Sequence, residues 1–115
     1  MKSYTTIEQS KKLAEFLPIE SADMGWYYSQ DPNTARLMMW CGTKAKGADI
    51  PCWSLAALLN VINKDFYPNL FHDGEAWNLT ATHHDDNTIK YDTCGDDPLD
   101  IIYRMIVFLH DQNLI

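Results

Sequence analysis

The sequence predicts an α+β domain in which an antiparallel sheet of about four strands packs against three helices, mainly on one face. Three observations support this: amphipathic helical patterns near both ends, a charge-free segment at 50–63, and strict apolar–polar alternation at 77–82 and 88–92. These elements follow the order αββαββα. A chain of 115 residues has the size of one domain, so residues 1–115 are expected to form a single domain.

A first helix is predicted over residues 6–17, where apolar side chains recur on one face. Thr5 or Thr6 can cap its first turn, and Glu8 or Gln9 lies three residues further on, which is the pattern of a capping box. A proline directly after residue 17 disfavours helical backbone at the residue before it, so the helix is expected to end there.

Two strands are predicted next. Residues 24–28 are rich in aromatic side chains, which favour strands, and a cluster of turn-forming residues follows at 29–33. Residues 36–41 are apolar on both faces, so we expect a central strand that is covered by helices or by a partner. Residues 42–47 are expected to form a basic turn.

The charge-free segment 50–63 is predicted to form an extended entry followed by a central helix. Pro51 suits the entrance of that helix, and a helix that is apolar on nearly every side is expected to be buried. We expect Trp53 to anchor the join between the two halves of the chain. Cys52 is expected at the N-terminus of the helix.

The following segment is predicted to contain a loop and a hairpin. Residues 65–75 include Tyr-Pro and Asp-Gly pairs, which are typical of a loop. Residues 77–82 and 88–92 are then expected to pair as antiparallel strands, because each alternates and the residues between them are polar.

The last helix is predicted from Pro98 to about Asp111, with Asp97 as its N-cap. Apolar side chains cover most of its circumference and leave only a narrow polar stripe. Such a helix either fills a core or offers one side to another subunit.

An internal duplication of an αββ unit is one explanation of this order. Residues 13–17 resemble residues 55–59, and each helix precedes a strand that begins near a tryptophan. The alternative is that amphipathic helices and hairpins share these features without common descent.

Charge and cysteine usage restrict the classes of partner and compartment. The formal net charge of −7 disfavours binding to nucleic acid and to anionic membrane surfaces. Three cysteines cannot all pair with one another, and the first residues show no apolar targeting segment, so a cytoplasmic protein with free thiols is expected.

Metal and cofactor sites are not predicted. Potential metal ligands are present, but no two of them have the spacing that lets one element bind a metal through two side chains. These residues are Cys41, Cys52, Cys94, His72, His83 and His84. No motif indicates a cofactor.

One enzymatic alternative centres on Cys52. A helix N-terminus lowers the pKa of a cysteine, and His83 or His84, oriented by Asp85, could supply a base. Cys-Trp at a helix start also resembles the nucleophile site of papain-like cysteine hydrolases, although the glycine-rich surround and upstream glutamine of those enzymes are missing. The other interpretation is that Cys52 packs as a small buried apolar residue.

A protein-binding surface is the favoured interpretation. The aromatic side chains exceed what one small sheet face can bury, and such side chains are enriched at interfaces. The candidate surface comprises Trp26, Tyr27, Tyr28, Trp40 and Trp77. If they do not simply complete the core, the first strand or the last helix is expected to mediate binding to a protein partner or self-association.

Four segments together resemble a group of small uncharacterised proteins from Bacteroidetes gut bacteria and their prophage-like elements. The segments are 50–59, 77–79, 91–92 and 106–110. The resemblance implies no activity and no catalytic residues. It implies an accessory protein of phage or mobile-element type, so we predict a non-catalytic domain that binds a protein or itself.

Overall fold

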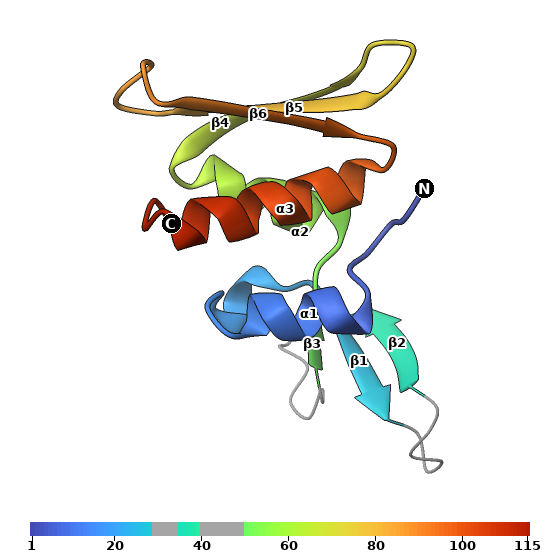
Figure 1. The fold of residues 1–115 in the computed structure, drawn as a ribbon. Coiled ribbons are helices and arrows are strands. Elements are labelled where there is room, and N and C mark those ends of the chain that lie inside the picture. Colours follow the sequence, from blue (N-terminus) through green and yellow to red (C-terminus); the bar gives the residue numbers. More distant parts are fainter. Residues whose placement is uncertain (29–34, 40–49) are drawn as a thin grey trace.

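Two antiparallel sheets lie at opposite ends of the molecule, with helices between and beside them (Figure 1). The computed structural model describes residues 1–28, 35–39 and 50–115, and of these the side chains at 1–26 and 50–115. Across these residues the order is one helix, three strands, one helix, three strands and a final helix. The α+β class is confirmed, whereas the predicted single sheet of about four strands is wrong: each half contributes a three-stranded sheet.

The first helix, α1, spans Ile7–Ala14 and begins with the predicted capping box. Thr6 Oγ1 accepts a hydrogen bond from Gln9 N at 3.1 Å, and Gln9 Oε1 accepts one from Thr6 N at 3.0 Å. The helix ends at Ala14 rather than at residue 17, because the chain tightens there into a turn in which Phe16 N donates to the carbonyl of Leu13. A 3₁₀ turn, η1 (Ile19–Ser21), follows.

The first sheet contains β1 (Met24–Tyr28), β2 (Ala35–Met39) and β3 (Ile50–Cys52) in the order β2-β1-β3. The aromatic strand β1 is therefore the central one, where the sequence predicted the following strand to be central. The predicted turns at 29–33 and 42–47 lie outside the described residues. Pro51 of β3 lies opposite Gly25 of β1. Because β3 is an edge strand, it tolerates a residue without a backbone N–H.

Helix α2 spans Leu55–Asn63, and its N-cap is Ser54. The helix entrance is therefore not at Pro51, where it was predicted. Ser54 Oγ accepts a hydrogen bond from Ala57 N at 3.2 Å, and the Ser54 hydroxyl in turn donates to Asp23. Trp53, directly before this cap, is fully buried, and its indole N–H donates to Ser21 Oγ at 2.9 Å. Trp53 thus joins the 3₁₀ turn of the first half to the start of α2, the anchoring role that the sequence predicted.

The second sheet is a meander of β4 (Phe66–His72), β5 (Trp77–His83) and β6 (Lys90–Gly95). Strand β4 occupies most of the segment predicted as a loop, and that prediction is wrong. Phe66 is fully buried, while Pro68 is tolerated because β4 is an edge strand. The predicted hairpin of β5 and β6 is confirmed, with β6 displaced toward the C-terminus.

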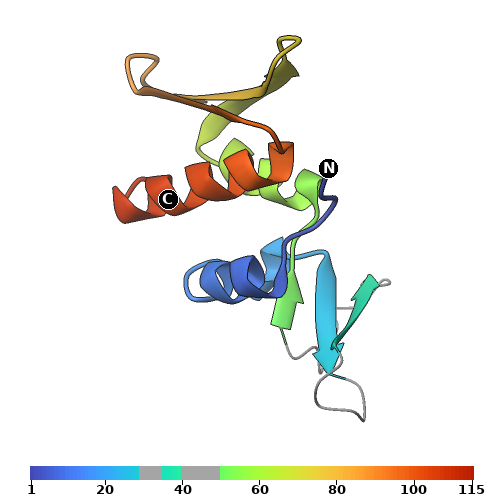
Figure 2. The same ribbon diagram turned by 45° about the vertical axis from the view of Figure 1, so that its right-hand side comes forward.

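Helix α3 spans Pro98–Asp111, with Asp97 as the predicted N-cap. Asp97 Oδ1 accepts hydrogen bonds from Leu99 N at 3.0 Å and Asp100 N at 3.3 Å. Figures 1 and 2 show α3 and α2 together beneath the second sheet. The apolar residues of α3 fill the core, although Phe108 remains 40% exposed. No helix among the described residues is long and apolar enough to cross a membrane.

The two sheets do not form a simple tandem repeat. In each, a central strand that contains a tryptophan is flanked by the next strand along the chain and by a third strand. That third strand follows the hairpin in the first sheet (β3) but precedes it in the second (β4). A direct αββ duplication therefore does not account for the edge strands.

Candidate functional site

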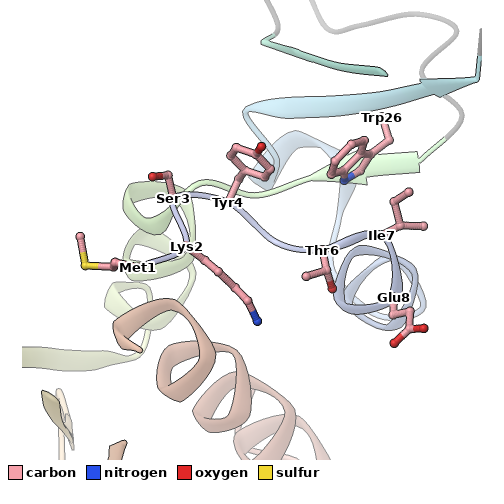
Figure 3. A pocket seen from close by; sticks show the side chains of 8 residues that line it. All are labelled: Met1, Lys2, Ser3, Tyr4, Thr6, Ile7, Glu8 and Trp26. Atoms are coloured by element: carbon pink, nitrogen blue, oxygen red, sulfur yellow. The ribbon is translucent and has the colours of Figure 1, made fainter. Parts of the chain in front are cut away.

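A pocket of about 660 Å³ opens between the N-terminal segment, the first turn of α1 and strand β1 (Figure 3). Tyr4 and Trp26 provide its aromatic wall, and Thr6, Ile7 and Glu8 line it from the start of α1. The pocket contains Trp26 of the predicted binding surface.

Long-range hydrogen bonds fix the N-terminal segment that forms one side of this pocket. Thr5 N donates to the carbonyl of Trp53 at 2.9 Å, and Leu55 N donates to the carbonyl of Ser3 at 3.3 Å. Tyr4, between them, forms an isolated β-bridge with Ser54. The position of Tyr4 therefore depends on the start of α2, far away in the sequence.

The aromatic pair is arranged edge to face. The ring centroids of Tyr4 and Trp26 are 5.9 Å apart, with an angle of 72° between the ring planes. Tyr4 is 38% exposed and Trp26 is half-buried, so both rings contribute to the surface as well as to the packing. Aromatic pairs of this geometry are favourable beyond the area that they bury.

The indole N–H of Trp26 is buried and has no acceptor among the described residues. In Figure 3 the nitrogen lies on the edge of the ring that faces the segment from Tyr4 to Thr6. The contrast with Trp53 is direct, since the indole N–H of Trp53 donates to Ser21 Oγ. An unpaired buried donor is uncommon in folded proteins and calls for a specific explanation.

Charged groups lie at the rim of the pocket. Lys2 Nζ forms an ion pair with Asp100 at 2.9 Å, so its charge is balanced within the chain. Glu8 is an exposed carboxylate in the first turn of α1, where the helix dipole favours a negative charge. Among the described residues that line the pocket, the charged side chains are Lys2 and Glu8.

Of the other members of the predicted surface, the structure describes the side chain of Trp77. Trp77 lies on β5 in the second sheet, half-buried against the core, with its ring edge to face with His72 at 5.2 Å. Tyr27 and Tyr28 continue β1, but their side chains, like Trp40, lie outside the described residues. Trp77 therefore lies in a different sheet from Trp26, whereas Tyr4, which the predicted surface did not include, lies against Trp26.

Cys52 lies in strand β3, not at a helix N-terminus, and it is fully buried. Its thiol donates to the carbonyl of Thr5 and lies 3.4 Å from Thr5 Oγ1. Burial raises the pKa of the Cys52 thiol, and the hydrogen bonds from Thr5 and Ser10 only partly oppose this effect. A nucleophilic cysteine needs a lowered pKa, so this environment matches a packing role.

The two candidate histidines belong to the second sheet. The His83 ring, at the end of β5, meets Phe66 edge to face at 5.1 Å, and the His84 ring lies 4.2 Å from that of Tyr67. Cys52 is in the first sheet, so the structure does not bring these imidazoles to its thiol (Figure 1). Within the described part of the chain, no three potential metal ligands gather into a cluster.

No protein-family model matches the chain, and no curated protein or solved structure is significantly similar to it.

Proposed function

We propose that this chain is a non-catalytic protein-binding domain, and that the pocket of Tyr4 and Trp26 is its contact site for a protein partner. The observation that carries the proposal is the buried indole N–H of Trp26, for which the described part of the chain offers no acceptor. Leaving a buried donor unpaired costs about 1–3 kcal/mol. Because this nitrogen is buried in the free protein, the Trp26 ring would have to turn outward before a carbonyl or carboxylate oxygen of a partner could accept from it and remove that cost.

The composition of the pocket supports a protein partner. Tyr and Trp are the side chains that most often dominate the binding energy of protein interfaces. Here they are adjacent, partly exposed and held by the backbone contacts of the N-terminal segment. A volume of about 660 Å³ accommodates one or two side chains of a partner.

The charge of the chain favours a partner with a basic surface. Opposite potentials accelerate encounter and select among partners, and this chain carries a formal net charge of −7 with Glu8 beside the pocket. A basic nucleic-acid-binding surface on a host or phage protein fits this charge. A cytoplasmic accessory role of phage or mobile-element type agrees with the unpaired thiols of Cys52 and Cys94 and with the resemblance described above.

A comparison of two tyrosine variants tests the proposal. Wild-type protein, Tyr4→Ala and Tyr67→Ala are each used to capture proteins from a lysate of the source organism. Tyr67 is a matched control, because it is 60% exposed and lies on the second sheet. We expect one stoichiometric partner that is captured by the wild type and Tyr67→Ala and lost with Tyr4→Ala. Equal capture by all three, or no stoichiometric partner, would refute the role of the pocket.

A further inference from the structure

Strand β6 has an edge whose backbone groups are available for pairing. On one side β6 pairs with β5, and no described strand pairs with its other side. His83 N donates to the carbonyl of Ile89 at 2.9 Å, and hydrogen-bonded pairs alternate along an antiparallel ladder. Lys90, Asp92 and Cys94 therefore turn their N–H and C=O groups away from β5.

A side-chain contact supports this assignment independently. Arg104 Nη2, on α3, donates to the carbonyl of Cys94 at 3.0 Å, so that carbonyl does point away from β5. The Arg104 side chain thus occupies the C-terminal end of the β6 edge. The backbone groups of Lys90 and Asp92 remain as the open part of the edge.

The opposite edge of the second sheet is less suited to pairing. His84 N donates to the carbonyl of Asp65, and Asp73 N donates to the carbonyl of Ala76. The same alternation turns the backbone of Pro68 outward on β4, where a proline offers no donor. A proline at this position blocks the addition of a strand, so β6 is the edge that accepts one.

A small groove lies directly beside the open edge. It has a volume of about 250 Å³ and lies between β6 and α3, with Tyr91, Arg104, Met105 and Phe108 among its lining residues. Tyr91 and Phe108 meet edge to face at 5.0 Å, and Phe108 is 40% exposed. A strand added to β6 would cover this aromatic pair.

We propose that a second copy of the chain adds to this edge, so that two β6 strands pair antiparallel about a two-fold axis at Tyr91 and join the two second sheets. In this register Lys90 lies opposite Asp92 of the partner subunit, and Asp92 lies opposite Lys90 of the partner subunit. Both charges stand on the face of the sheet away from α3, since Lys90 and Asp92 are exposed. On the other face Tyr91 meets its symmetry mate beside the two Phe108 rings.

Charge selects this register over its neighbours. An axis at Asp92 would place two carboxylates opposite each other, and an axis at Lys90 would do the same with two ammonium groups. Like charges directly opposite in a sheet are destabilising, whereas opposite charges are favourable. An axis at Thr93 would require the carbonyl of Cys94, which Arg104 already engages.

The inference goes beyond the proposed function and uses a different surface from the Tyr4–Trp26 pocket, so each can fail without the other. A contact through one short strand and two aromatic side chains from each copy is at the small end of specific interfaces. We therefore expect a reversible dimer that forms as the protein concentration rises.

Charge exchange on the full chain tests the dimer by sedimentation equilibrium. We expect Lys90→Asp and Asp92→Lys each to weaken dimerisation by about 10-fold or more, because each replaces two attractive pairs by two repulsive ones. The double variant restores both pairs and should dimerise like the wild type. Glu75→Lys is the matched control, because it makes the same charge change as Asp92→Lys at an exposed position outside β6.

A zero-length carbodiimide cross-link tests the register. The expected product is a covalent dimer joined between Lys90 and Asp92. A wild-type protein that stays monomeric at all concentrations overturns the inference. A dimer whose association is unchanged in both single variants also overturns it, and would show self-association through another surface.

Discussion

The backbone N–H of Trp53 donates to Thr5 Oγ1 at 3.1 Å, and the backbone N–H of Thr5 donates to the carbonyl of Trp53 at 2.9 Å. The two residues are 48 positions apart in the sequence. This reciprocal pair attaches the N-terminal segment to the join between β3 and α2. Thr5 is fully buried, and its hydroxyl also lies 2.7 Å from that of Ser10. The wall of the Tyr4–Trp26 pocket depends on this attachment.

Replacing the Thr5 hydroxyl should destabilise the fold. Thr5→Val keeps the side-chain shape but removes the buried hydroxyl that contacts the backbone N–H of Trp53 and the hydroxyl of Ser10. We expect a loss of about 1–3 kcal/mol in the free energy of unfolding, measured by urea denaturation. Thr88→Val, in an exposed turn, should change stability far less. Equal losses in the two variants would contradict the role assigned to Thr5.

The two tryptophans should respond differently to the same substitution. Trp53→Phe leaves a cavity in the core and removes the hydrogen bond to Ser21, and we expect a loss of about 2 kcal/mol or more. Trp26→Phe removes a donor that has no acceptor among residues 1–28, 35–39 and 50–115, so the loss should stay below about 1 kcal/mol. Thermal or chemical denaturation compares them directly. A larger loss for Trp26→Phe would mean that its indole N–H is satisfied in the free protein.

Cys52 should react slowly with alkylating reagents. It is fully buried with a raised thiol pKa, whereas Cys94 is exposed on β6. With iodoacetamide near neutral pH, mass spectrometry should find Cys94 modified well before Cys52 in the native protein. In denaturant the two rates should become similar. Faster native modification of Cys52 would revive the cysteine-hydrolase alternative.

Asp100 should contribute stability that depends on pH. Partial burial acts to raise its pKa, but hydrogen bonds from Lys2 and Gln9 and the charges of Lys2 and Arg104 outweigh it and lower the pKa below 3.8. A carboxylate whose pKa is lower in the folded state stabilises the fold above its unfolded pKa, and this contribution is lost as the pH falls through the folded pKa.

Asp100→Asn isolates that contribution. At neutral pH the variant should be less stable than the wild type by less than about 1 kcal/mol, because solvent screens this partly exposed ion pair. The difference should shrink as the pH falls below 3.8, the ordinary value for an aspartate. Denaturation curves over a range of pH measure it, and a difference that grows in acid would contradict the assignment.

Local patterns predicted the elements whose ends depend on their own residues. The capping box at Thr6 and the Asp97 cap of α3 appear in the structure as the sequence indicated. The segment of β3 was predicted only as an extended entry to a helix, because Pro51 suits a helix entrance, and β4 was missed because Pro68 suggests a loop. In the structure β3 pairs with the distant strand β1 and β4 pairs with the next strand, β5, and each proline lies on an edge strand, where it is tolerated.

The site was predicted only in part for the same reason. The aromatic content of β1 drew attention to Trp26, but Tyr4 reaches the pocket through a bridge to Ser54 that no local pattern signals. Whether the indole N–H of a tryptophan finds an acceptor depends on its tertiary neighbours. Trp26 and Trp53 look alike in the sequence and differ in this respect in the structure.

The most direct measurement for the protein-binding pocket is photo-cross-linking in cells of the source organism. A photoreactive phenylalanine analogue is placed at Tyr4 in one protein and at Tyr67 in another as the control. We expect one dominant covalent adduct with a partner protein from the position of Tyr4 and none from that of Tyr67. No adduct from the position of Tyr4, or the same adduct from both positions, would contradict it.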